Sequence, residues 1–142
     1  MAFNPNEKTM AGCLQRIQQA AKSSGLDINK DIITSRDTVL KEVLNSLEVT
    51  NIPNGFVKVQ LPVSFDGPTT TYMSFGAPRT KVPVHSHDEG AGIRVIISGS
   101  IKYNGQRLTA GDWMYIPKGK SYEFEVGNMG VGMFYCYQCC CA

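Results

Sequence analysis

Apolar positions divide the chain into a helical first third and a strand-rich remainder. In the first part, apolar residues recur at the three- and four-residue spacing of a single helix face. They are Met10, Cys13, Leu14, Ile17, Ala20 and Ala21, and then Val39, Leu40, Val43, Leu44 and Leu47. Gly25 suits the end of the first helix, and Thr34 or Ser35 is a candidate cap for the second. The spacing predicts two amphipathic helices within residues 1–50.

Beyond residue 51, short runs rich in β-branched and aromatic residues alternate with Gly, Pro and Asn. The runs are Phe56–Val63, Thr69–Phe75, Lys81–His85, Ile93–Ile97, Ile101–Tyr103, Trp113–Ile116, Tyr122–Val126 and Val131–Tyr137. Asn104-Gly105 is a strong hairpin signal because this pair favours a type I′ turn. Many short strands at close spacing predict an antiparallel sandwich or barrel over residues 51–142. We expect the helical segment, residues 1–50, to pack on it.

Composition and charge exclude several classes of function. The 142 residues suffice for one domain with a core of its own. The net charge is +2, and the fourteen Lys and Arg residues are scattered, so we expect no nucleic-acid partner. No segment has the apolar core of a signal peptide or the length of a membrane span, so a cytoplasmic protein without a membrane partner is expected. Adjacent cysteines at the C-terminal end do not resemble a disulfide framework.

The two histidines of the chain, His85 and His87, are the first candidates for chemistry. Side chains two positions apart project from the same face of an extended strand. A shared target is therefore expected, and a metal ion is the first candidate for it. The second candidate is a polar pocket in which both imidazoles are hydrogen-bonded and no metal is bound.

Two motifs resemble those of the cupin superfamily. The first runs from His85-Ser86-His87 through a glycine-containing stretch to a strand ending at Gly99, and the second runs from Gly111 to Pro117-Lys118-Gly119 and Tyr122. The resemblance extends over roughly residues 56–138 by the strand pattern. It implies a mainly β fold, a cupin-type double-stranded β-helix (jelly roll) preceded by the two helices. It also implies an interior that holds a small molecule or a metal, and a homodimer.

The match departs from the family at the metal-ligand positions. Cupin sites commonly use two histidines and a glutamate from the first motif and a third histidine from the second. Here Gly92 stands at the glutamate position and Tyr122 at the third-histidine position. Two imidazoles alone hold a divalent ion poorly, because protein sites usually supply at least three donors.

A further donor would complete a site for iron, manganese, nickel or zinc. Glu89 or Asp88 would supply a carboxylate if the loop folds back over His85 and His87, and Cys136 would supply a thiolate if it points inward. Without a metal, Tyr122 and either histidine would form an acid–base pair.

Arg94 lies two residues after Gly92 and shares its face of the strand. If that face lines the interior, the guanidinium would hold a substrate carboxylate or phosphate through two hydrogen bonds. Otherwise Arg94 lies on the outer face or reaches the rim.

The fold by itself does not decide the function. The first hypothesis is a cupin-type enzyme acting on a small organic molecule, with His85 and His87 as metal ligands or acid–base groups, and with Arg94 and Tyr122 assisting. Whether the reaction is that of an isomerase, cyclase, lyase or dioxygenase is left open. The alternative is a small-molecule-binding or sensor protein without turnover.

Overall fold

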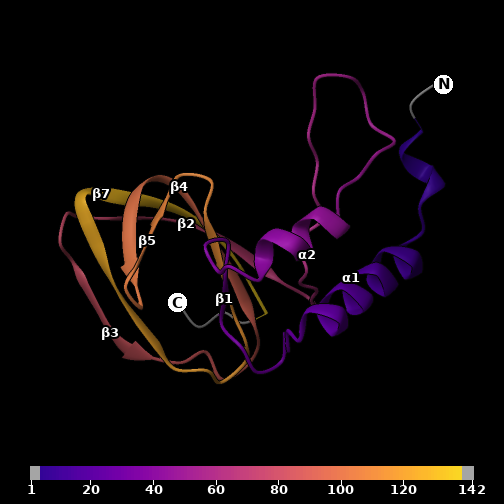
Figure 1. The fold of residues 1–142 in the computed structure, drawn as a ribbon. Helices are drawn as coiled ribbons and strands as arrows, with labels where there is room; N and C mark the ends of the chain where they lie inside the picture. Colours follow the sequence, from indigo (N-terminus) through magenta and orange to yellow (C-terminus); the bar gives the residue numbers. More distant parts are fainter. Residues whose placement is uncertain (1–3, 139–142) are drawn as a thin grey trace. The chain divides into compact units, whose positions relative to one another are not determined.

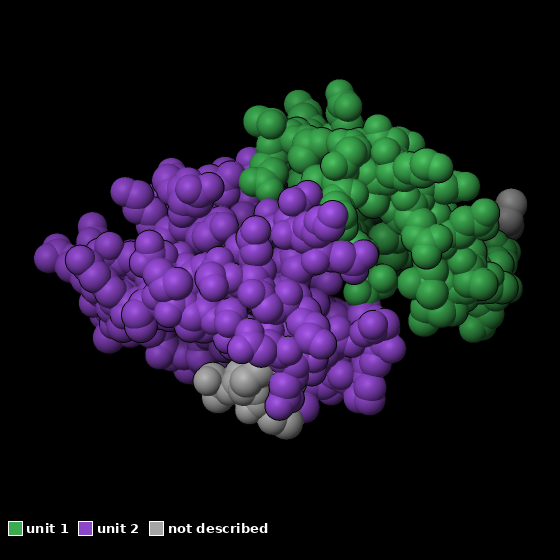
Figure 2. Space-filling view, turned by 90° about the horizontal axis from the view of Figure 1, so that it is seen from below, with its two compact units in different colours: residues 1–28, 37–64 green, residues 29–36, 65–142 purple. Residues whose placement is uncertain are grey.

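The computed structural model describes residues 4–138, which form two compact units (Figure 2). The first unit contains the described residues up to 28 together with residues 37–64, and the second contains residues 29–36 and the described residues from 65 onward. The expected segments, residues 1–50 and 51–142, differ from these units, since residues 51–64 lie in the first unit and residues 29–36 lie in the second. The packing of the helical segment on the sheet stays a prediction.

The first unit holds a short 3-10 helix, Pro5–Glu7, and the helices α1, Met10–Ser24, and α2, Leu40–Ser46 (Figure 1). Helix α1 begins where the Thr9 hydroxyl accepts a hydrogen bond from the Gly12 amide at 3.1 Å. It ends at Gly25, whose φ of 74° is favourable for glycine. The predicted first helix is confirmed. Among the described residues, no helix is long and apolar enough to cross a membrane.

A small core and one arginine connect the two helices of the first unit. Ala20 of α1 packs with Val43 and Leu47, and all three are buried. The Arg16 guanidinium donates to the Ser46 carbonyl at 3.3 Å and to the Glu48 carbonyl at 3.2 Å. These carbonyls lie at the C-terminal end of α2, where helix carbonyls lack partners within the helix, so a cation is favourable there.

Two local predictions are wrong. Thr34 does not cap the second helix, because Ile33–Thr34 forms a short strand, β1, and α2 begins only at Leu40, without a side-chain cap. Residues 56–63 do not form a strand either. Their pairing is limited to a single bridge between Val59 and Glu48.

The second unit consists of antiparallel strands (Figure 1), and the predicted mainly β fold is confirmed. After β1 the strands are β2 Thr70–Gly76, β3 Lys81–His85, β4 Gly92–Tyr103, β5 Gln106–Thr109, β6 Trp113–Ile116 and β7 Tyr122–Tyr137. Strands β4 and β7 each join two of the predicted runs into one long strand. Strand β5 follows the predicted Asn104-Gly105 turn.

The long strands β4 and β7 are shared by two layers. Near Gly92–Ile96, β4 pairs with β6 and with the last part of β7, which in turn pairs with β2. Beyond register shifts on either side of Ser98–Gly99, β4 pairs with β5 and with the first part of β7, which pairs with β3. Apolar residues from both layers form one core: Ile96, Ile101, Leu108, Met114, Ile116, Tyr122, Phe124, Val126, Val131 and Met133. Two antiparallel layers around a common core form a jelly roll.

Glycine is required where β4 passes from one layer to the other. Gly99 has a φ of 67°, and a Cβ atom there would lie 1.9 Å from the Gly130 carbonyl oxygen. A side chain at residue 99 would therefore separate β4 from β7 at the register shift.

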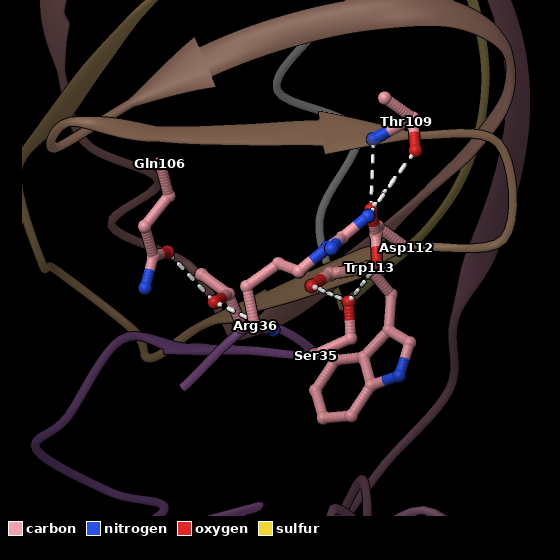
Figure 3. Close-up of polar contacts among 7 residues, drawn as sticks. Ser35, Arg36, Gln106, Thr109, Asp112 and Trp113 are labelled. Atoms are coloured by element: carbon pink, nitrogen blue, oxygen red, sulfur yellow. Dashed lines mark hydrogen bonds and ion pairs between the residues drawn. The ribbon is translucent and has the colours of Figure 1, made fainter. Parts of the chain in front are cut away.

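Asp112, in the turn before β6, connects this turn to the segment that carries β1 (Figure 3). Its carboxylate accepts hydrogen bonds from the Thr109 amide at 2.8 Å, from the Ser35 hydroxyl at 2.9 Å and from Nε of Arg36 at 2.9 Å. Burial by itself raises the pKa of this carboxyl, but the hydrogen bonds from Thr109, Arg36 and Ser35 outweigh it and hold the pKa below its usual value.

Candidate functional site

The two histidines lie side by side, as the sequence predicts. His85 is the last residue of β3 and is half-buried, and His87 lies just beyond the strand and is 6% exposed. Their rings meet edge to face with centroids 5.2 Å apart. The Nδ1 atom of His85 lies 2.8 Å from the Pro83 carbonyl, and this contact orients the ring. Tyr122, the first residue of β7, is paired in register with His85, so the strand pairing brings the phenol to both imidazoles.

Tyr122 contacts both histidines. Its ring centroid lies 4.5 Å from that of His85, and its hydroxyl lies 3.3 Å from Nε2 of His87. The phenol is almost fully buried. In this geometry a proton can pass between the hydroxyl and the imidazole nitrogen without bulk water.

Arg94 points into the interior, so the reading that places it on the outer face or at the rim is wrong. Its side chain is 4% exposed. One guanidinium nitrogen, Nη2, donates to the hydroxyl of Tyr122 at 2.8 Å and to that of Tyr137 at 2.5 Å. The guanidinium carbon lies 4.0 Å from the ring centroid of Tyr135, which is within cation–π distance.

Three residues of the site were not predicted. Tyr135 and Tyr137 lie on β7 at alternate positions, and the β2 residue Ser74 shares a short hydrogen bond with the Tyr135 hydroxyl. The alternation of β7 could have placed Tyr135 and Tyr137 together, since residues at every second position share one face of a strand. Arg94 pairs in register with Tyr135, so the same face of β4 and β7 supplies the guanidinium and the phenols.

Position 92 explains how Tyr137 enters the site. A Cβ atom on Gly92 would lie 1.7 Å from the Cδ1 atom of the Tyr137 ring. The ring therefore occupies the space that a side chain at this position would need. It also lies against His87, with centroids 4.7 Å apart.

The buried charge of Arg94 dominates the electrostatics of the site. Burial alone would lower the pKa of the guanidinium. The electrostatic interactions with Tyr122, Tyr137 and Tyr135 outweigh burial and raise the pKa, so Arg94 is always protonated. Burial raises the pKa of the Tyr137 phenol far above its usual value, and the Arg94 charge offsets this only in part. Tyr137 is thus a neutral phenol at any physiological pH.

In the described part of the chain, the side chains around His85 and His87 do not make up a donor set for a divalent metal ion. Glu89, the predicted carboxylate ligand, is exposed in the turn that follows His87, and Cys136 is a half-buried free cysteine of β7. Within residues 4–138, no three His, Cys, Asp or Glu side chains lie close enough together to hold a metal ion. A permanent cation also contacts the phenol that touches His87. The structure brings together His85, His87, Arg94 and Tyr122 but not Glu89.

The arrangement suits proton transfer. Nε2 of His87 contacts the Tyr122 oxygen, and Arg94 donates to that same oxygen. A charged donor stabilises the negative charge that develops on a phenol oxygen as its proton leaves. His87, Tyr122 and Arg94 require no further ligand to provide a base and an acid.

Comparison with known proteins finds similarity only among solved structures. No family model and no curated protein matches the sequence. A Ralstonia eutropha protein of unknown function with a cupin-like fold is 26% identical, with a TM-score of 0.44 over 48% of this chain and 45% of its own. A cupin protein from Bacteroides fragilis is 27% identical, with a TM-score of 0.40 over 49% of this chain and 63% of its own. The Cnp3 cupin domain of Schizosaccharomyces pombe is 15% identical, with a TM-score of 0.44 over 53% of this chain and 55% of its own.

These structures include cupins, as the two motifs had led us to expect. The chain spans less than two thirds of the length of each of the three. The likenesses cover about half of this chain, and the jelly roll follows from the strand pairing itself.

Proposed function

We propose that the strand-rich unit carries an enzyme site for a small organic molecule in which His87 and Tyr122 exchange protons with the substrate. The observation that carries this proposal is the 3.3 Å contact between Nε2 of His87 and the Tyr122 hydroxyl, inside a site from which water is largely excluded. Proton abstraction and return, as in isomerases and epimerases, is the reaction type that such a pair supports.

The half-buried His85 suits the entrance of this site. It is more accessible than His87, and its ring contacts both His87 and Tyr122. A substrate that enters beside His85 would meet the phenol and the inner imidazole together. His85 would then position the substrate, and His87 and Tyr122 would carry the proton.

Replacing Tyr122 by Phe tests the proposal, because it removes the hydroxyl and keeps the ring. Mixtures of small organic acids and sugars are incubated with the protein in D2O, and deuterium incorporation is measured by mass spectrometry. We expect incorporation into one component by the unmodified protein and a loss of about 10²-fold or more in Tyr122→Phe. The half-buried Tyr72 of β2 provides the control, and Tyr72→Phe should retain the rate.

Binding without turnover is the competing function. A binding or sensor protein would retain a ligand through dialysis and return it unlabelled and chemically unchanged. Such a result, or an unaltered rate in Tyr122→Phe, would reject the acid–base site.

The resemblance to cupins also leads us to propose a homodimer. Met73 and Phe75 of β2 are 54% and 79% exposed, and Met73 is paired in register with Phe134 of β7. Met73 and Phe75 form an apolar face on β2 that continues to Phe134 of β7. Strand β2 is the last strand on one side of its layer among the described residues. Contiguous exposed apolar residues on an edge strand favour association with a second copy.

A further inference from the structure

We infer that the first unit carries a binding site of its own, for a small neutral amide. The site is a cavity of about 290 Å³, which is lined by residues before α1, by residues of α1 and by residues within 49–60. The inference is independent of the proposed function, because all the residues that line this cavity belong to the first unit. It is carried by two residues of the cavity wall, Arg16 and Gln60.

Arg16 of α1 supplies a hydrogen-bond donor. Its Nη2 atom donates to the carbonyl oxygens of Ser46, at 3.3 Å, and Glu48, at 3.2 Å. Its Nη1 atom is buried and makes no hydrogen bond among the described residues. The two carbonyl oxygens carry partial negative charge at the end of α2, so they already compensate part of the charge of Arg16. Arg16 therefore lacks an acceptor for Nη1 rather than a full negative charge.

Gln60 supplies a hydrogen-bond acceptor. Its Nε2 atom donates to the Cys13 carbonyl at 3.3 Å, and its backbone amide donates to the Leu47 carbonyl at 3.0 Å. The Cys13 contact fixes which end of the side-chain amide is the nitrogen, since a carbonyl oxygen only accepts hydrogen bonds. The other end, Oε1, is buried and has no hydrogen-bond partner in the described part of the chain. A buried donor and a buried acceptor without partners both cost free energy, which a ligand with complementary groups would recover.

The size and the wall of the cavity favour a small organic molecule over ordered water alone. A water molecule takes up only about 30 Å³ in the liquid. Pro5, Val49 and Ile52 line the cavity, so part of its wall is apolar. Sites for small molecules combine such apolar walls with a few polar groups that fix the orientation of the ligand. A volume of about 290 Å³ is at the lower end of the size of such sites, so the ligand is small.

One free donor together with one free acceptor indicates an amide group. The carbonyl oxygen of an amide would accept from Nη1 of Arg16, and its N–H group would donate to Oε1 of Gln60. A carboxylate has only acceptors, so it would leave Oε1 of Gln60 without a donor. Lys8 and Lys58 also line the cavity, but both are exposed, so solvent and salt screen the attraction that they exert on an anion.

The test compares three probes of nearly the same shape: benzamide, acetophenone and benzoate. Acetophenone has a methyl group, and benzoate a charged oxygen, where benzamide has its amide nitrogen. Binding to the full chain is followed by the NMR shifts of the backbone amides. We expect benzamide to bind at millimolar concentration and to shift the amides of Cys13, Val49 and Gln60. Acetophenone and benzoate should bind more weakly by about fivefold or more, because neither donates to Gln60.

Variants of the two residues test the same contacts from the side of the protein. Arg16→Met removes the donor and Gln60→Met removes the acceptor, and each should weaken benzamide binding by about fivefold or more. Gln18→Met, at an exposed position of α1, and Arg107→Met, at an exposed position of β5, are the matched controls and should not change it. Arg16→Lys keeps a cation beside the carbonyls of α2 if Arg16→Met does not fold, and it should show the same loss.

Three results would overturn the inference. The first is no binding of benzamide up to tens of millimolar, which would leave the cavity to water. The second is binding of acetophenone or benzoate as tight as that of benzamide, and the third is a set of shifts confined to the strand-rich unit. Tyr122→Phe should leave benzamide binding unchanged, so the failure of the proposed reaction and the failure of this site are observed separately.

Discussion

At the scale of single residues, the absence of a side chain at position 92 determines what the interior contains. The Tyr137 ring lies where a Cβ atom on Gly92 would be. The Tyr137 hydroxyl in turn accepts a hydrogen bond from Arg94, and the Tyr137 ring lies against the His87 ring. One missing side chain thus brings a phenol into the site in place of a side chain from β4.

Gly92→Ala should destabilise the second unit by about 3 kcal/mol, because overpacking a rigid site usually costs this order of free energy. Chemical denaturation of the purified protein measures the free energy of unfolding. In a Tyr137→Ala background the same substitution should cost far less, since the clashing ring is gone.

Gly67→Ala is the control for this prediction. A Cβ atom there would meet its nearest neighbour, Nε2 of Gln138, at 3.5 Å, which is an ordinary contact. Its effect should stay within about 0.5 kcal/mol. Equal losses for Gly92→Ala and Gly67→Ala, or full additivity with Tyr137→Ala, would contradict the packing described for position 92.

Sequence reasoning reached part of the site and missed the rest for identifiable reasons. The two-residue spacing of His85 and His87 and the motif position of Tyr122 placed three residues together. The direction of Arg94 was not determined, because the irregular stretch between His87 and Gly92 sets the register of β4. The alternation of β7 places Tyr135 and Tyr137 on one face, but only the long-range pairing of β7 with β4 brings Tyr137 to position 92.

At the scale of elements, β1 is a short strand whose neighbouring residues are held by one side chain, Asp112. It has two residues, Ile33 and Thr34, which pair with Tyr115 and Met114 of β6. The Asp112 carboxylate holds the adjoining Ser35 and Arg36 by hydrogen bonds. A strand this short requires such anchors, because its ladder supplies few backbone hydrogen bonds.

Asp112→Asn should therefore lower the free energy of unfolding at pH 7 by about 1–2 kcal/mol, the scale of charge-assisted hydrogen bonds. The pKa of Asp112 is lower in the folded protein than in the unfolded chain. Its contribution is then fully present above the unfolded pKa, near 4, and is lost as the pH falls through the lower, folded pKa. Unfolding curves from pH 7 to pH 2 should converge for the two proteins at the acidic end.

Glu123→Gln, which changes an exposed carboxylate on β7, is the matched control and should leave the curve nearly unchanged. A difference between Asp112→Asn and the unmodified protein that is constant at every pH would show that the charge of Asp112 is not what anchors β1.

The errors at the level of elements have a common cause. Thr34 looks like a helix cap, and residues 56–63 alternate like a strand, but a local pattern does not reveal whether a partner strand is near. Ile33–Thr34 pairs with the strand β6, whereas Val59 makes only a single bridge with Glu48. Strand pairing was decided by tertiary contacts that overrode local propensity.

At the scale of the whole molecule, the apolar face on β2 leads to a prediction about assembly. Light scattering coupled to size-exclusion chromatography should give twice the mass of one chain. Phe75→Asp should reduce this to a single chain, because it places a charge within the apolar face. Met10→Ser, at an equally exposed position of α1, should leave the mass unchanged. A single-chain mass for the unmodified protein would reject the dimer.

The position of β7 has a consequence for how the protein is made. This strand pairs with β2, β3 and β4, all of which precede it in the chain. During translation, those three segments leave the ribosome before the strand that joins them exists. Their apolar faces stay uncovered until residues 122–137 emerge, and this interval is when a nascent chain is most exposed to aggregation and to chaperone capture.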